Sequence, residues 1–179
     1  MDTKENNEAS VLGALIHGYA QACLNLNIVA GRKVTDFMAN IEVNQFYPLS
    51  QWADLERIVV QSYQNSDPIM LRVGIEMMNA WYHYGPGKEL IKNGVDFLHF
   101  QTGSGGYDSV VKGTDDLIGK FELKNINLEE GLATVYSTTP FNRKMECGVL
   151  IGGMLSPGDL DYVDIVNESD PDHLEIEFH

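Results

Sequence analysis

The sequence predicts an α+β fold, in which an N-terminal helical half packs on a four-stranded antiparallel sheet and the C-terminal half runs β-β-α-β-β. The prediction follows from the spacing of apolar residues, which is three or four in the first part of the chain and two in the last. With 179 residues, 44% of them hydrophobic, the chain is long enough for one domain with a sizeable core. We therefore expect a single domain over 1–179, with a disordered polar arm at 1–8, a helical half at 9–102 and a sheet half at 117–178.

Three helices are predicted before residue 65. The first, over 11–29, has Ser10 as its predicted cap and Gly31 as its predicted stop. Its apolar face consists of Leu12, Leu15, Tyr19, Cys23 and Leu26. Shorter helices are predicted over 33–42 and 50–64, since their apolar residues also recur every three or four positions.

A fourth helix has the clearest boundaries. Asp67 and Pro68 suit the cap and the first position of a helix, and "GPG" at 85–87 ends it. A weaker helix is predicted over 88–100. The glycine-rich stretch at 102–113 is predicted to be a flexible connection between the two halves.

The predicted strands are short segments with alternating or β-branched residues. They are "GKFELK", "GLATVYSTT", "DYVDIVNE" and "HLEIEFH". Because apolar and polar residues alternate, these strands should form an antiparallel sheet with one face in water.

The helix between the second and third strands contains the stretch "CGVLIGGML" at 147–155. Asn142 can cap this helix, and Gly148 and Gly152 lie four apart on one face. No Lys-Ser or Lys-Thr follows the glycines, as a phosphate-binding loop requires, and nine residues are too few to cross a bilayer. We favour close packing against a neighbouring backbone or ring over ligand contact as the role of these glycines.

The charge is strongly negative. Twelve Lys and Arg against 26 Asp and Glu give a net charge of −14, which would repel nucleic acid and anionic lipid. The start of the chain lacks the pattern of a signal peptide, and nowhere do 18 apolar residues run together. Cys23 and Cys147 form no metal or disulfide motif. We therefore expect a cytoplasmic protein without nucleic-acid binding or membrane insertion.

Several motifs resemble a known superfamily over residues 11–178. The matching residues are Phe46, Tyr47, Pro48, Trp52, Leu55, Trp81, Tyr82 and the closing run "CGVLIGGML…DYVDIVNES…HLEIEF". They resemble the superfamily of vinyl-reductase-like small-molecule-binding domains, haem-nitric-oxide-binding domains, TRAPP-type trafficking subunits and a myxobacterial paralogous family of similar length. The resemblance implies that the glycine-bearing helix leads into two terminal strands, the first ending in a glutamate, here Glu168.

Two departures from the superfamily bear on cofactors. Vinyl-reductase-like members usually carry metal-binding cysteines after that glutamate, whereas "NESDPDHLEI" contains none. In haem-binding members the arginine of a Tyr-x-Ser-x-Arg motif holds a haem propionate. The nearest string here, "YSTTP", has Thr138 in the serine place and Pro140 in the arginine place. The sequence therefore supports neither zinc nor haem, and the cofactor is unknown.

Candidates for catalysis are few. The histidines are His17, His83, His99, His173 and His179, and none has the spacing of a metal-binding motif. Cys147 lies next to Glu146, which would raise the pKa of its thiol and disfavour the nucleophilic thiolate. No motif of a catalytic serine is present. We therefore expect a protein that is not an enzyme, and an enzyme with a His or Cys centre is the least favoured hypothesis.

Aromatic and methionine side chains on the helices are the candidate ligand-binding residues, because amphipathic rings and flexible thioethers adapt to apolar ligands. They are Trp52, Tyr63, Met77, Trp81, His83 and Tyr84. The same residues could instead form the core or a subunit interface. His83 also suits the end of a helix, where the dipole favours a positive charge.

Three functional hypotheses remain after these observations. The first is a sensory or regulatory domain that binds a small apolar or aromatic molecule, a protein partner or a second copy of the chain. It would act by differential binding between two states. The second is a protein-interaction adaptor or dimerisation module without a ligand, as the TRAPP-type resemblance implies. The third is a haem-binding gas sensor.

Overall fold

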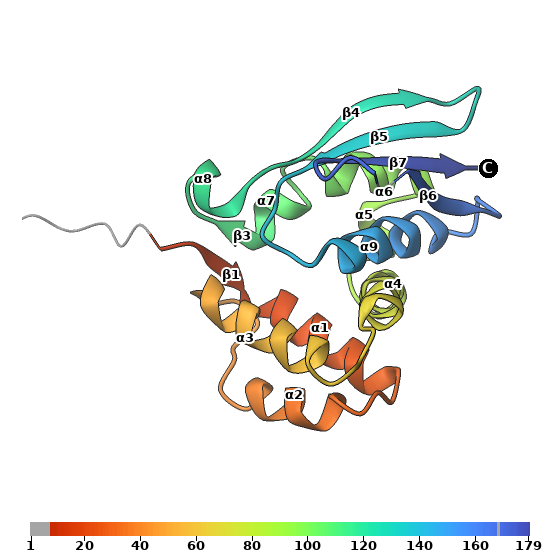
Figure 1. Cartoon of the computed structure of the whole chain (residues 1–179). Coiled ribbons are helices and arrows are strands. Elements are labelled where there is room, and N and C mark those ends of the chain that lie inside the picture. The colour runs from red at the N-terminus through yellow and green to blue at the C-terminus, as the bar shows by residue number, and fades with distance from the viewer. Residues whose placement is uncertain (1–7, 168) are drawn as a thin grey trace, which may run out of the picture.

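The computed structural model describes residues 8–167 and 169–179 (Figure 1). The expected disordered arm at 1–8 therefore falls almost wholly outside the described residues, as does Glu168. The helices are α1 (Gly13–Asn25), α2 (Gly31–Met38), α3 (Leu49–Val60), α4 (Asp67–Tyr84), α5 (Gly87–Leu90), α6 (Gly94–Gln101), α7 (Tyr107–Val110), α8 (Asp115–Ile118) and α9 (Arg143–Leu155). The strands are β1 (Ser10–Leu12), β2 (Phe46–Pro48), β3 (Val111–Lys112), β4 (Phe121–Asn127), β5 (Leu132–Ser137), β6 (Val163–Asn167) and β7 (His173–Phe178).

The predicted α+β architecture is confirmed. Figure 1 shows α1, α2 and α3 on the side away from the four-stranded sheet, with α4 and α9 between these helices and the sheet. The helix that we expected over 88–100 is broken into α5 and α6, because the Asn93 side chain caps α6 by accepting a hydrogen bond from Asp96 N at 2.7 Å. Within the described ranges no helix is both long and apolar enough to cross a membrane.

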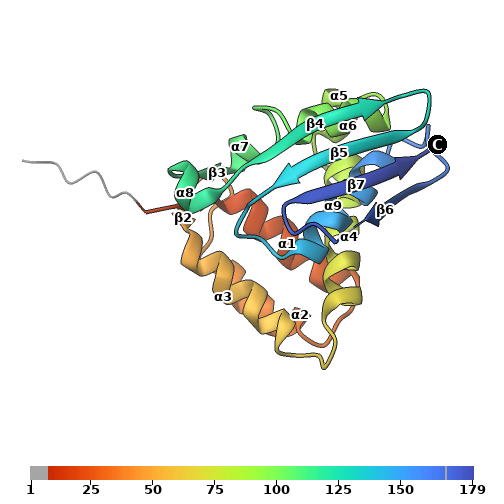
Figure 2. The same cartoon turned by 45° about the horizontal axis from the view of Figure 1, so that its top comes forward.

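The four-stranded sheet has the order β4-β5-β7-β6 and is antiparallel throughout (Figure 2). On β7, Leu174 and Ile176 are fully buried while Glu175 between them is exposed. The same alternation on β6 buries Val163 and Ile165. The prediction of a sheet with one face in water is therefore confirmed for the described strands.

A second, three-stranded sheet was not predicted. It has the order β2-β1-β3, with β1 antiparallel to both neighbours. Ser10 therefore belongs to a strand, where it pairs with Pro48 and Lys112, and does not cap α1 as expected. Gly31 begins α2 instead of stopping α1.

The glycine-rich stretch at 102–113 is not a flexible connection as expected. It contains α7 and part of the small sheet, and Tyr107 within it is only 3% exposed. The Tyr107 hydroxyl donates a hydrogen bond of 2.5 Å to the carbonyl of Ile118. This buried anchor fixes the segment against the sheet half.

The glycines of α9 serve close packing, as predicted. A Cβ atom on Gly148 would lie 2.1 Å from the carbonyl oxygen of Leu71 on α4, and one on Gly152 would lie 2.7 Å from Ile75 Cα. Gly74 mirrors this on α4, since its added Cβ would lie 2.1 Å from the carbonyl oxygen of Met145. The backbones of α4 and α9 therefore touch without intervening side chains.

Two clusters of buried residues flank this helix pair. The helical core lies around Tyr19, Trp52 and Met70, and the sheet core lies around Phe97, Leu150 and Ile176. Both α4 and α9 contribute to both clusters. The junction between the two clusters is where the structure leaves space.

Candidate functional site

A cavity of about 400 Å³ lies at this junction, and we call it the aromatic cavity. Its walls come from α1, α4, α6, the α7 segment, β4 and α9, so both halves of the chain are needed to form it. Six aromatic side chains are among the lining residues: Trp81, Phe97, Phe100, Tyr107, Phe121 and Phe141. Most of the other lining residues are also apolar.

The rings of the aromatic cavity form two groups. The Trp81 ring stacks on Phe100 at a centroid distance of 5.4 Å and meets Phe97 edge-on at 6.3 Å. Tyr107 lies 6.0 Å from Phe121 and 5.7 Å from Phe141. Pairs at such distances hold one another in fixed orientations, so the walls are organised before any ligand enters.

Small residues of α1 form another part of the lining. Ala14 and Gly18 lie four residues apart on the helix, and both line the cavity. A Cβ atom added to Gly18 would meet no heavy atom within 4 Å, unlike one on Gly148. Because Ala14, Leu90 and Ser109 line the cavity and are also exposed, they mark the side on which it meets solvent.

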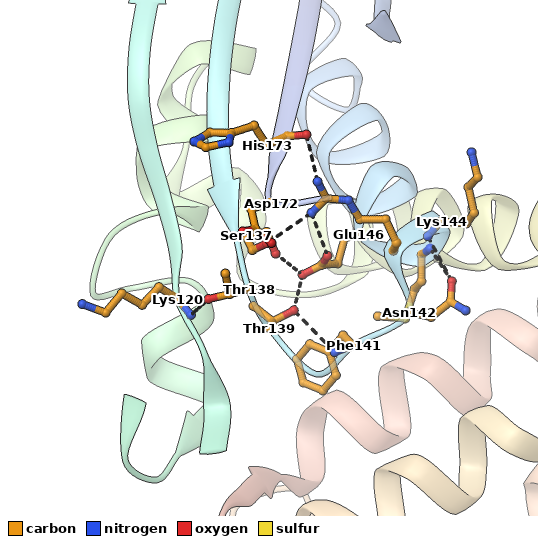
Figure 3. A network of polar contacts seen from close by, with 12 residues as sticks. Lys120, Ser137, Thr138, Thr139, Phe141, Asn142, Lys144, Glu146, Asp172 and His173 are labelled. Atoms are coloured by element: carbon orange, nitrogen blue, oxygen red, sulfur yellow. Dashed lines mark hydrogen bonds and ion pairs between the residues drawn. The ribbon is translucent and has the colours of Figure 1, made fainter. Parts of the chain in front are cut away.

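Glu146 is the charged side chain among the described lining residues, and it is only 5% exposed. It lies in the first turn of α9, where the helix dipole favours a negative charge. Its Oε1 accepts hydrogen bonds from Ser137 Oγ at 2.9 Å and from Thr139 Oγ1 (Figure 3). Its Oε2 lies 3.8 Å from Arg143 Nη1, which is longer than a hydrogen bond.

The Arg143 guanidinium donates mainly to backbone carbonyls. Its Nη2 donates to the carbonyl of His173 at 2.9 Å and its Nη1 donates to that of Ser137 at 3.4 Å. Burial raises the pKa of Glu146 to about 7, against the opposing effects of the two hydroxyls and Arg143. Burial also raises the pKa of Glu56, whose carboxyl accepts a hydrogen bond from Asn142 N at 3.0 Å. Two carboxyls with a raised pKa thus lie near the start of α9.

The lining residues do not fit a histidine-ligated haem. No Lys, Arg or His belongs to the described lining of the aromatic cavity, so neither a proximal histidine nor a base for a propionate is present. Pro140, in the arginine place of the haem motif, is exposed, and Thr138 Oγ1 accepts a hydrogen bond from Lys120 N at 3.1 Å. Glu146 lines the cavity instead, and its charge would repel an anionic propionate.

The histidines lie elsewhere. His17 Nε2 is 2.6 Å from the carbonyl oxygen of Ile41, and His173 Nδ1 is 3.1 Å from Asp170 Oδ2. His99 is exposed on α6. Over residues 8–167 and 169–179, no group of three or more His, Cys, Asp or Glu side chains could hold a metal ion.

Of the six candidate ligand-binding residues, Met77 and Trp81 line the aromatic cavity. Trp52 lies in the helical core, 1% exposed, with its ring 5.0 Å from that of Tyr19. The Tyr63 hydroxyl accepts a hydrogen bond from Val29 N at 3.1 Å. His83 and Tyr84 are exposed at the end of α4, where Tyr84 is 89% exposed.

Sequence reasoning missed five of the six aromatic lining residues and Glu146. Four of these aromatic residues, Phe97, Phe100, Tyr107 and Phe121, lie in segments predicted to be a weak helix, a linker and a strand, and Phe141 lies just before the predicted helix cap Asn142. Glu146 did carry a signal, because it is a lone acidic residue within the apolar run "MECGVLIGGML". A charge in such a run is expected to be buried, and a buried charge needs partners.

Comparison with known proteins identifies the fold. No protein-family model matches the chain, and no curated protein matches it in sequence. Solved structures of H-NOX domains do match. An oxygen-binding H-NOX domain related to soluble guanylate cyclases has a TM-score of 0.63 and 13% identity, covering 93% of this chain and 94% of that one. A variant of Tt H-NOX with a single substitution has the same TM-score and coverage at 15% identity.

A third structure, from a study of H-NOX activation, has a TM-score of 0.57 and 14% identity over 92% of this chain and 94% of its own. At these identities the similarity shows the fold alone. It supports the haem-nitric-oxide-binding part of the sequence resemblance, and the vinyl-reductase-like and TRAPP-type parts stay predictions.

Proposed function

We propose that this chain is a non-enzymatic sensory or regulatory domain that binds a small, largely apolar molecule in the aromatic cavity. The observation that carries the proposal is the cavity itself. Its volume of about 400 Å³ is in the range of small-molecule sites, and its walls are rings and aliphatic side chains with few polar groups. A fold shared with H-NOX domains, one of which is described as oxygen-binding, supports a ligand-binding role.

The cavity favours this proposal over a ligand-free adaptor. An adaptor needs no internal space, and its core would be expected to fill with side chains at native packing density. In this chain the junction of the two cores contains the aromatic cavity. The rings that line the cavity are already held in place by other rings, as in the pairs Trp81–Phe100 and Tyr107–Phe141. Haem is not part of the proposal, because the lining lacks a histidine and a base for the propionates.

A ligand at this position contacts both halves of the fold. Met77 and Trp81 belong to α4, Val149 belongs to α9, and Phe121 belongs to the sheet. A molecule that fits one arrangement of these elements better than another would shift the population between them. The output of the domain is then a conformational or assembly change, with a protein partner or a second copy of the chain as its receiver.

The test fills part of the aromatic cavity with a larger side chain at Gly18 of α1. The Gly18→Leu variant places a leucine side chain into the space above Gly18, and Ala53→Leu places the same side chain on the exposed face of α3 as the control. We expect ethylnaphthalene, a neutral aromatic probe, to bind the wild type and the control with similar affinity, and Gly18→Leu at least tenfold more weakly. Calorimetry and the shifts of methionine methyl resonances report binding. Equal binding by a folded Gly18→Leu variant, or no binding by the wild type, would overturn the proposal.

A further inference from the structure

The charge inside the aromatic cavity specifies the ligand further, and this inference rests on the proposed function. We propose that the ligand is a small lipophilic amine whose ammonium group pairs with the Glu146 carboxylate while its apolar body lies among the aromatic rings. The cavity and the buried carboxylate on its wall together carry this inference.

The negative charge of Glu146 disfavours an acidic ligand. Glu146 lines the cavity, and no basic residue is among the described lining residues. A carboxylate or phosphate brought into this space would meet a like charge in a weakly polarisable environment, which is costly. A cation would instead supply the positive charge that stabilises a buried carboxylate.

The carboxylate of Glu146 keeps capacity for a further donor. Its Oε1 receives both hydroxyl hydrogen bonds, from Ser137 and Thr139, which tie the end of β5 to α9. Its Oε2 has the 3.8 Å ion pair with Arg143, whose N–H groups donate to backbone carbonyls. An ionised carboxylate has about four acceptor positions, so an ammonium N–H can bind without displacing these partners.

The rings add a second attraction for a cation. A positively charged group over the face of an aromatic ring, within about 6 Å of its centre, is attracted by the negative electrostatic potential of that face. Phe141 lies close to the Glu146 end of the cavity, because its N–H donates to Thr139 Oγ1, which itself donates to Glu146, and the Tyr107 ring lies 5.7 Å from that of Phe141. A neutral hydrocarbon would use the rings but would bring no further donor or positive charge to the Glu146 carboxylate.

The pH dependence of binding follows from the groups around Glu146. Arg143 favours the charged form of Glu146, and Glu56 disfavours it. Tyr107 stays neutral, because burial raises the pKa of its hydroxyl. With the pKa of Glu146 at about 7, its ionised fraction rises about tenfold between pH 6 and pH 8. An alkylamine remains protonated over this range, so its affinity should rise by about the same factor.

Three probes of matched size separate the possibilities: naphthylethylamine, ethylnaphthalene and naphthylacetate. With the wild type at pH 8, we expect calorimetry to show that the amine binds at least tenfold more tightly than the hydrocarbon, and that the acid binds most weakly. In Glu146→Gln, which can still accept the Ser137 and Thr139 hydrogen bonds, the amine should lose its advantage while ethylnaphthalene binds as before.

The outcomes distinguish this inference from the proposed function. If ethylnaphthalene binds but the amine binds no more tightly, or the advantage of the amine survives in Glu146→Gln, the amine assignment is wrong and the apolar site stands. If ethylnaphthalene does not bind the wild type, the proposed function fails as well. Should Glu146→Gln not fold, the wild type alone decides, because only the affinity for the amine should rise between pH 6 and pH 8.

Discussion

Replacing Gly148 by alanine tests the close contact of α4 and α9. The new Cβ would lie 2.1 Å from the carbonyl oxygen of Leu71 and 3.0 Å from Gly74 Cα, where ordinary contact begins at 3.4 Å. Both obstacles are backbone atoms of a helix, so they cannot rotate away and the two helices must separate. Overpacking of this kind costs typically about 1–3 kcal/mol, and the higher end applies because backbone must move.

The opposing effect is the better helix propensity of alanine, worth about 1 kcal/mol. We therefore expect Gly148→Ala to lower the free energy of unfolding by about 2 kcal/mol, which corresponds to a loss of roughly 4–8 °C in Tm for a domain of this size. Gly18→Ala is the matched control, since it also lies inside a helix but its Cβ would meet nothing within 4 Å. Its free energy of unfolding should rise by up to about 1 kcal/mol.

Thermal and urea denaturation followed by circular dichroism measure both variants under the same conditions. The chemical change is identical at the two positions, so the difference of about 3 kcal/mol between them reports the packing of α9 on α4. If Gly148→Ala is as stable as Gly18→Ala, the helices are not in backbone contact and the account of the glycines is refuted.

Three further predictions concern α9 and the sheet. Because the pKa of Glu146 is raised from its ordinary 4.5 to about 7, the folded state binds more protons between these values, and this group should lower stability by about 2–3 kcal/mol as pH rises from 5 to 8. Urea titrations should show that the wild type loses about 2–3 kcal/mol more stability over this range than Glu146→Gln, in which Glu56 still titrates with a raised pKa, and parallel profiles would contradict this. Asn142→Ala should lower the free energy of unfolding by about 1 kcal/mol in urea, since it removes the two cap hydrogen bonds of α9; an unchanged midpoint would show that the cap is dispensable. Gly131→Ala should lower Tm more than Gly158→Ala, because both residues have positive φ but only at Gly131 would the Cβ clash, 2.0 Å from the carbonyl oxygen of Phe178. Equal losses in Tm would contradict that clash.

The sheet half was predictable because its signal is local. The alternation of Leu174, Ile176 and Phe178 with two glutamates fixes which face of β7 is buried, whereas its pairing with β5 and β6 comes from the structure. The glycines of α9 were also predictable, since glycine inside a helical pattern lowers helix propensity unless close packing compensates for the loss.

The small sheet and the anchored linker were not predictable from local pattern. β1 and β3 have three and two residues, too few to show a period, and their pairing depends on segments about 100 residues apart. Tyr107 lies in a stretch whose glycines suggest flexibility, and only its hydrogen bond to Ile118 and its burial show otherwise. Tertiary contacts therefore overrode local propensity here.

The candidate site was predicted only in part, for a related reason. Periodicity identified Met77 and Trp81 as members of one helical face but could not show whether that face meets side chains or open space. The cavity depends on the absence of a side chain at Gly18 of α1 and on the aromatic rings of α6 and β4. Such an arrangement of distant segments leaves no mark in a single stretch of sequence.

The bare backbone contact between α4 and α9 limits how this protein can move. If α4 and α9 moved apart, a gap would open at Gly74 and Gly148 that no side chain there could fill, and the lost contacts would oppose the separation. The two helices should therefore move together as one rigid body about the turns that end them. A molecule bound beside Met77 and Val149 would then displace both helices at once.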